Sequence, residues 1–331
     1  MAETEDPSDE QTLVDAGDAD SAVDERSIVS STTSLRSSIY DYPIINGRTF
    51  PRSRTTEYWC PHDDRQQNGL DIAHHIVWRL KGEKLFKAPI DRFDRVLDIG
   101  TGTGIWAIDM ADEFPSAEVI GTDISPEQPS WVPPNCVFHI DDAQLKWTYA
   151  LKSFDFVHIR GLYGSIGSWE ELYRQTYDAL RPGGWIENTE VSILVQSDAQ
   201  AVKNDPDHIF WRWAKVLWEG ADRMGKTLRI VDDGKMSKLI GDAGFVQVEE
   251  TKYKVPIGSW SRDPTASEIG ESGLAFMLES LEGFALFILK EIMGWTYDEI
   301  QVFVKEMREA ISNPTLRPYY CMVNVYGRKA A

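Results

Sequence analysis

The chain has few cysteines and no residue cluster with metal-ligand spacing. Its three cysteines, Cys60, Cys136 and Cys321, are far apart and odd in number, which excludes a disulfide scaffold and a CxxC-type metal site. No His-Cys cluster or paired-carboxylate spacing predicts a metal ion either. Such a composition fits a reducing compartment, so we expect a cytoplasmic protein, with the nucleus as the alternative.

Basic charge and uncharged apolar runs are also scarce. The 34 basic residues face 53 acidic ones, for a net charge of −19, so nucleic acid is not an expected partner. The most apolar window, residues 273–295, contains four charged side chains, which argues against a membrane helix. No apolar stretch follows a basic start, so we expect no signal peptide. Hydrophobic residues still make up 42% of the chain, enough for a sizeable core.

Acidic and hydroxyl side chains dominate the N-terminal segment. Residues 1–26 carry ten acidic side chains and one basic side chain, and residues 27–38 carry eight Ser or Thr. A segment with so little to bury cannot offset its ordering entropy. We therefore predict a disordered tail over residues 1–38, with a phosphorylated regulatory segment as the functional alternative.

Short apolar strands alternate with helices from residue 91 onward. The pattern predicts a seven-stranded, mainly parallel, Rossmann-like α/β sheet with helices on both faces. Residues 39–90 form an N-terminal helical lid segment in this interpretation, and helical insertions lie near 196–228 and 256–318. The expected strands are 95–100, 117–123, 137–140, 154–159, 185–191, 245–255 and 319–328; the expected helices are 66–80, 104–113, 169–180, 206–224, 232–243, 268–293 and 297–311.

The most informative motif is the turn after the first of these strands. Asp98, Gly100, Gly102 and Gly104 form a D-x-G-x-G-x-G sequence between a strand and a helix. A dinucleotide site needs G-x-G-x-x-G, and its third glycine would fall at Ile105. A carboxylate at Asp98 would repel a pyrophosphate but favour an ammonium group. The turn therefore predicts a site for S-adenosylmethionine (SAM), the alternative being a purely structural turn.

Acidic residues after the next two strands extend this prediction. Asp123 ends the second strand, where a carboxylate can accept hydrogen bonds from both ribose hydroxyls. Asp142 follows the third strand and is a candidate acceptor for the adenine amino group, with Ile124 and Ala143 beside the ring. For Asp142 the alternative is an ordinary surface-loop acid.

Taken together, these segments resemble the class I SAM-dependent methyltransferases, and more narrowly the fungal LaeA-like methyltransferases of secondary metabolism. The resemblance spans residues 34–329 and is weakest over 196–318. It implies a methyltransferase fold, SAM as cofactor with S-adenosylhomocysteine as product, and cofactor contacts from Thr101 and Arg160 as well. The matching segments are 58–75, 95–109, 118–142, 154–160, 181–187 and 323–329. The chain departs from the family pattern at His62 and Asp64, where members often carry Asn and Glu.

The family contains two kinds of protein, and both remain open for this chain. One is an enzyme that methylates a small acidic, phenolic or amine-bearing metabolite. The other is a nuclear regulator that binds velvet-type protein partners. A nucleic-acid methyltransferase is disfavoured, because Arg160 and the residues after it lack an N/D-P-P-Y/F element.

Several side chains are candidates for a role in the reaction. His75 and His158 are candidate general bases, although a lone histidine is more often structural. Residues 58–80 and the helix at 206–224 are expected to enclose the acceptor. Tyr58 is a candidate cation–π partner of the sulfonium. The expected substrate contacts are Trp59, Tyr163, Trp211 and Trp213, with the alternative that the tryptophans are core residues.

Deleting residues 1–34 should leave catalytic turnover and the melting temperature nearly unchanged, because this segment has little to bury. Calorimetric melting and a methyl-transfer assay on the shortened chain would test this. A large drop in either quantity would show that the tail docks on the folded part.

Overall fold

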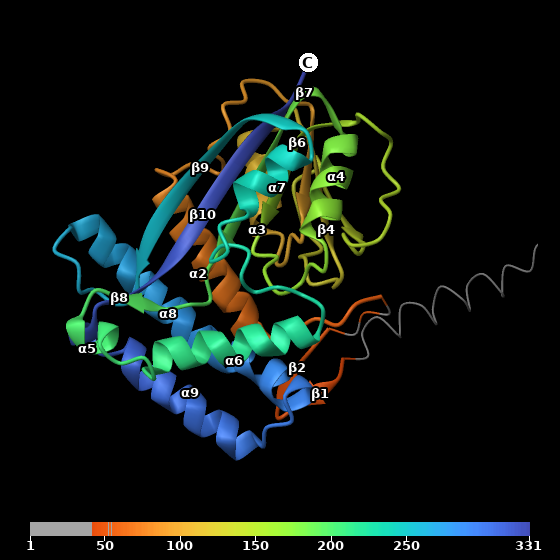
Figure 1. Ribbon diagram of the computed structural model, residues 1–331. Helices are drawn as coiled ribbons and strands as arrows, with labels where there is room; N and C mark the ends of the chain where they lie inside the picture. The colour runs from red at the N-terminus through yellow and green to blue at the C-terminus, as the bar shows by residue number, and fades with distance from the viewer. Residues whose placement is uncertain (1–41, 52, 54) are drawn as a thin grey trace, which may run out of the picture. The chain divides into compact units, whose positions relative to one another are not determined.

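The computed structural model describes residues 42–51, 53 and 55–331, so the predicted tail over 1–38 lies outside the described residues. Residues 41–331 cluster as one compact unit, and residues 42–90 are part of it (Figure 1). The strands are β1 Ile44–Ile45, β2 Arg48–Thr49, β3 Arg95–Ile99, β4 Glu118–Asp123, β5 Cys136–Ile140, β6 Phe154–Arg160, β7 Leu180–Val191, β8 Gln196–Ser197, β9 Phe245–Pro256 and β10 Pro318–Lys329. The helices are α2 Asp64–Leu80, α3 Ile105–Glu113, α4 Trp169–Ala179, α5 Gln200–Lys203, α6 Ile209–Arg223, α7 Met236–Asp242, α8 Pro264–Phe287 with a π-helical end Ile288–Ile292, α9 Tyr297–Ile311 and a 3₁₀ turn Pro314–Leu316.

The central sheet has the order β5-β4-β3-β6-β7-β10-β8, and β9 pairs with β10. The first five strands are parallel, whereas β10 runs antiparallel to β7, β8 and β9. The predicted mainly parallel α/β fold is confirmed. The two-residue strand β8 is an addition, and its single pair of residues carries no alternation that a sequence could reveal.

Strand alternation divides the core between the two faces of the sheet. Val96, Val119 and Phe156 pack toward α3 in one cluster of buried residues. Leu97 and Ile186 point the other way, into the larger cluster that includes α4 and α7. Helices thus cover both faces, as a parallel sheet requires.

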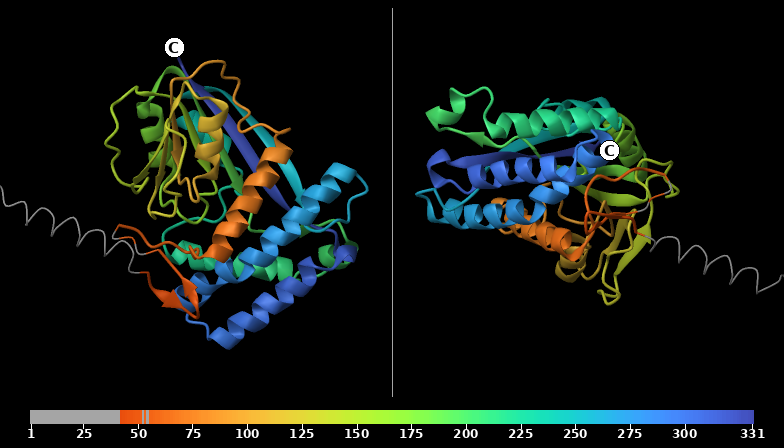
Figure 2. Two further views of the ribbon diagram at one scale, coloured as in Figure 1. Left: turned by 180° about the vertical axis from the view of Figure 1, so that it is seen from behind. Right: turned by 90° about the horizontal axis from the view of Figure 1, so that it is seen from below.

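A second layer of helices lies at one end of the sheet. Figures 1 and 2 show α6, α8 and α9 beside one another, with α2 running from this layer to the sheet. Residues Pro264–Ile292, α8 with its π-helical end, are long and apolar enough to cross a membrane by length and composition, but 61% of the apolar 18-residue stretch within them is buried inside the fold. Phe276, Leu281 and Phe284 belong to the main core, so α8 has the surroundings of a core helix.

A buried ion pair fastens α2 to the sheet. Lys81, directly after α2, donates from Nζ to Glu187 Oε1 on β7 at 2.7 Å, and both side chains are fully buried. The other oxygen of Glu187 accepts the backbone N–H groups of Lys87 and Ala88, each at 2.7 Å. One carboxylate therefore fixes both the end of α2 and the loop that follows it.

Lys81→Met should lower the free energy of unfolding by about 3–5 kcal/mol, because it leaves a buried carboxylate without its counter-charge. Urea denaturation would measure the change. Lys238→Met, which removes a solvent-exposed ion pair to Asp242, is the matched control and should change stability little. Equal, small effects of the two substitutions would contradict this account.

Candidate active site

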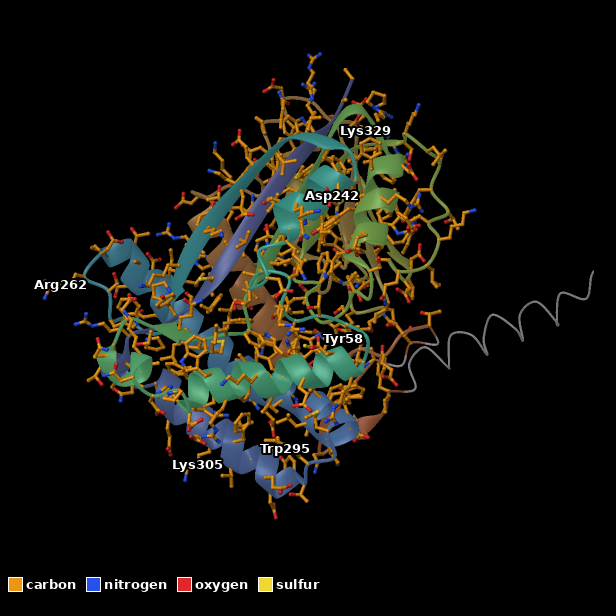
Figure 3. All side chains as sticks on the ribbon, in the orientation of Figure 1. Tyr58, Asp242, Arg262, Trp295, Lys305 and Lys329 are labelled. Carbon is orange, nitrogen blue, oxygen red and sulfur yellow. The ribbon has the colours of Figure 1, made fainter. Side chains whose placement is uncertain are left out.

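A cavity of about 170 Å³ opens at the carboxyl ends of the parallel strands. Such strand ends are the usual ligand site of open α/β sheets. Tyr58 sits at this end, and Lys329 at the far end of β10 marks the opposite edge (Figure 3). The predicted site residues that line it are Tyr58, Gly100, Thr101, Gly102, Asp123, Ile124, Asp142, Ala143, Arg160 and Tyr163.

The glycine turn forms the floor of the cavity in a left-handed backbone conformation. Gly100, Gly102 and Gly104 have φ values of +69°, +58° and +82°, a region that side chains disfavour. A Cβ atom on Gly102 would meet only Leu70 within 4 Å, so this position is open toward the cavity. Gly104 does not line the cavity: a Cβ there would collide with the ring of Phe138, so its role is close packing at the start of α3.

Asp98 lies beneath this turn and does not line the cavity. Its Oδ2 accepts from Thr101 Oγ1 at 2.6 Å, and its Oδ1 is 2.7 Å from His158 Nδ1. The structure therefore does not place Asp98 in the cavity lining as expected, and its predicted contact with the ammonium group of the cofactor through water stays a prediction. Both oxygens are occupied inside the fold, so Asp98 acts on the site by holding Thr101 in place.

Asp123 stands at the rim of the turn with its carboxylate held by the backbone. Oδ2 accepts from the N–H of Gly102 at 2.9 Å, and Oδ1 accepts from the N–H of Ser125 at 3.0 Å. Burial raises the pKa of Asp123 to about 7, although these N–H groups act in the opposite direction. The carboxylate retains free lone pairs beside the cavity for hydroxyl donors.

Asp142 lies at the neighbouring strand end. Its Oδ2 accepts from Thr55 Oγ1 at 2.6 Å and its Oδ1 from the N–H of Gln144 at 3.0 Å. Ile124 and Ala143 line the same part of the cavity. Two apolar walls with a carboxylate between them suit a flat, amine-bearing ring.

Neither predicted catalytic histidine reaches the cavity. His158 is buried and stacks on Trp106, with ring centroids 3.7 Å apart and planes 6° apart. Burial lowers its pKa to about 4. His75 is solvent-exposed and contacts Trp78. Both predictions are wrong, because the strand and the helix turn these side chains away from the ligand.

The neighbour of His75 is the histidine that faces inward. His74 is buried, and its ring bonds Asp109 and Arg160. The helical periodicity of the sequence carried this signal, since His74 shares a face with Leu70, Ala73 and Val77.

The predicted tryptophan contacts are core residues instead. Trp59 packs on Tyr163 and Phe284 and donates its indole N–H to the carbonyl of Tyr163 at 3.3 Å. Trp213 is fully buried and stacks on Phe303, and Trp211 packs at the edge of the same core. No residue of α6 lines the cavity, so the expected lid from this helix is wrong. The lid segment around α2 does line it, through Tyr58, Leu70, Ala73, Ile76 and Val77.

Residues from the end of the chain complete the cavity wall. Tyr320 and Met322 on β10 and Phe276 on α8 line it, and none of them was predicted. They come from segments far along the chain: β10 pairs with β7 in the sheet, and α8 packs on α2 and β9. A local sequence motif holds no information about that pairing.

Comparisons with known proteins agree on one family. A methyltransferase domain model matches residues 73–250. The chain belongs to the SAM-dependent methyltransferase family. Its cofactor is SAM, and the turn, the open Gly102 position and the accepting carboxylate of Asp123 fit that molecule.

Among curated relatives, this methyltransferase is similar to the methyltransferase pytC of Aspergillus terreus, at 36% identity over 91% of this chain and 92% of that protein. It is also similar to the secondary metabolism regulator LAE1 of Cochliobolus heterostrophus, at 32% identity over 83% of this chain and 90% of that protein. Among solved structures it is similar to phosphoethanolamine N-methyltransferase 2 of Haemonchus contortus, at 17% identity, with a TM-score of 0.45 over 86% of this chain and 62% of that one.

We expect the affinity for S-adenosylhomocysteine to be about tenfold lower near pH 6 than near pH 8, because protonated Asp123 accepts ribose hydroxyls less well. Asp123→Asn should weaken binding and remove this pH dependence. Calorimetric titration would measure both effects. Asp112→Asn, an exposed carboxyl on α3, is the control, and an affinity that does not vary with pH in the unsubstituted protein would contradict the role of Asp123.

Proposed function

We propose that this methyltransferase moves the methyl group of SAM to a small-molecule acceptor, a secondary metabolite with an acidic or phenolic oxygen. The observation that carries the proposal is the lining of the cavity on the side away from the glycine turn. There Phe276, Tyr320 and Met322 line it with side chains of the fold itself, and a mostly apolar lining with a few polar groups is typical of sites for small molecules.

The cofactor half would use the residues around the glycine turn. Asp123 would accept the ribose hydroxyls, and Asp142 the adenine amino group between Ile124 and Ala143. SAM supplies the electrophilic methyl group and its own leaving group. The chain contributes alignment and the exclusion of water, which together can supply roughly 7–11 kcal/mol of a barrier.

Hydroxyl donors characterise the acceptor half. Tyr163 and Tyr320 line the cavity, and burial raises the pKa of each phenol. They therefore stay protonated at neutral pH and can donate to an oxygen of the acceptor. The buried carboxyl of Glu190 supports them by accepting the backbone N–H groups of Leu162 and Tyr163 at 3.1 and 2.9 Å.

Proton acceptors are scarce in the same half. Within the part of the chain that the structure describes, no His, Lys or Glu lines the cavity, and its aspartates, Asp123, Asp141 and Asp142, belong to the cofactor half. An acceptor that arrives already ionised needs no general base. A carboxylic acid or an acidic phenol fits this lining better than an alcohol or a protonated amine.

A second candidate function is regulation through protein partners. The similarity to LAE1, a secondary metabolism regulator, supports it, and velvet-type proteins would be the partners. Gly102→Val, which puts a branched side chain at the open floor of the cavity, separates the two functions. If the variant loses methyl transfer but still binds its protein partner, partner recognition does not require the cofactor.

Incubating the protein with isotope-labelled SAM and an extract of the organism that encodes it should label one small metabolite. Mass spectrometry would identify it and the methylated atom. Label found only in protein would contradict the proposal and favour the regulatory function.

Tyr163→Phe and Tyr320→Phe should each lower kcat/KM for that metabolite about tenfold, because each removes one hydrogen bond to the acceptor. Affinity for S-adenosylhomocysteine should stay the same. Tyr319→Phe is the control, since Tyr319 lies outside the cavity against Lys254. Unchanged kinetics in both cavity variants would show that these phenols do not contact the acceptor.

A further inference from the structure

Arg160 brings a positive charge to the cavity, and the carboxylates that act on it, Asp98, Asp109 and Asp71, do so from beyond ion-pair contact. It ends β6 and lines the cavity beside the glycine turn, since Ile159 pairs with Ile99 immediately before Gly100. Among the residues with described positions, no carboxylate lies within the 4.0 Å of an ion pair from this guanidinium. A partly buried guanidinium of this kind is suited to an anionic ligand group.

The guanidinium of Arg160 donates to His74, and Asp109 on the other side of the ring fixes the tautomer of this histidine. Asp109 Oδ2 lies 2.9 Å from His74 Nε2, and an unprotonated ring there places its single N–H toward that carboxylate. His74 Nδ1 then carries a lone pair and accepts from Arg160 Nη1 at 3.1 Å. Asp109, His74 and Arg160 thus form a directional chain from α3 through α2 to β6.

The charges around His74 keep this chain in one protonation state at neutral pH. Burial, together with the charge of Arg160, lowers the pKa of His74, while Asp109 on α3 and Asp71 on α2 act in the opposite direction. Asp71 also accepts from Thr103 Oγ1 at 2.9 Å. Asp98 faces Arg160 from β3, but its oxygens bond Thr101 and His158, so it does not replace His74.

We propose that His74 is a positioning residue that, oriented by Asp109, aims the Arg160 guanidinium at the carboxylate of the methionine portion of SAM. The inference rests on the methyl-donor part of the proposed function and not on the identity of the acceptor. Three observations support this proposal. Arg160 has no carboxylate in ion-pair contact, it lies beside Gly100, and it donates a hydrogen bond to the fixed imidazole of His74.

Two ligands separate this role from a general structural one. S-adenosylhomocysteine carries the carboxylate, whereas 5′-methylthioadenosine keeps the nucleoside and lacks the amino-acid portion. Calorimetry should show that Arg160→Met lowers the affinity for S-adenosylhomocysteine about ten- to a hundredfold. His74→Ala or Asp109→Asn should lower it about three- to tenfold. The affinity for 5′-methylthioadenosine should stay within about twofold for every variant, which also shows that each is folded.

Two variants serve as matched controls, one at His74 itself and one at its neighbour His75. His74→Gln keeps one donor and one acceptor, so it should retain the preference for S-adenosylhomocysteine. His75→Ala changes the exposed neighbour and should change neither affinity.

The pH dependence gives a further readout. Protonation of His74 replaces its accepting lone pair with an N–H that faces Arg160. Because its pKa is lowered, the ratio of the two affinities should be constant from pH 8 to about 6.5 and fall at more acidic pH. In His74→Gln the ratio should not change. The titration of Asp123 affects the binding of both ligands and cancels in the ratio.

Three outcomes would overturn the proposal. Equal losses for both ligands in the His74 and Arg160 variants would assign these residues a structural role, while the cofactor site itself would stand. Unchanged S-adenosylhomocysteine affinity with impaired acceptor use would place Arg160 at the acceptor. Failure of the unsubstituted protein to bind either ligand would refute the methyl-donor part of the proposed function, and with it this inference.

Discussion

The buried carboxylate of Glu187 is the constraint on which the cavity depends. It sits in the middle of β7 and binds the ammonium of Lys81 and two backbone N–H groups of the following loop. Apart from these bonds, α2 packs on α8 and α3 and reaches the sheet through the hydrogen bond between His74 and Arg160. The position of α2 decides where Leu70 and His74 stand over the glycine turn, so the roof of the cavity takes its alignment from β7.

Several other buried acids hold loops beside the cavity. Asp98 holds Thr101, Asp123 accepts from Gly102, and Glu190 accepts from Leu162 and Tyr163. Each carboxylate fixes a loop that lines the cavity. Burial raises the pKa of Asp123 to about 7 and that of Glu190 to about 8, so two of these loops are held by groups that titrate near neutral pH. Asp123 and Glu190 bind their loops through backbone N–H groups, and Asp98 binds its loop through the hydroxyl of Thr101, so each loop has a buried hydrogen-bond anchor.

The sequence predicted the sheet and most of the residues that line the cavity at the glycine turn and the neighbouring strand ends, because both depend on local signals. A buried strand, a glycine turn and a helix are adjacent in the chain, and Asp123 and Asp142 follow strands whose order is standard for such a sheet. The acceptor half depends on pairings between distant segments, which no local pattern contains. Phe276 and Tyr320 were therefore missed, and Trp59 and Trp213 were placed in the cavity although their bulk fills the core.

For the histidines, local patterns did not decide which individual side chain contacts a residue of the cavity lining. A helix turns the side chains of His74 and His75 in directions about 100° apart, so one lies beside Arg160 and the other in solvent. The periodicity pointed to His74, while the search for a proton acceptor favoured its neighbour. For His158, the strand alternation was correct, but the face it selected is covered by Trp106.

The placement of β10 has a consequence for how the chain is made. This strand, residues Pro318–Lys329, lies between β7 and β9, both of which precede it in the chain. During synthesis the sheet must keep a gap, or leave β9 undocked, until these last residues emerge from the ribosome. The nascent chain meanwhile exposes the apolar edge of β7 and lacks Tyr320 and Met322. Until β10 has been translated, the wall of the cavity is therefore incomplete.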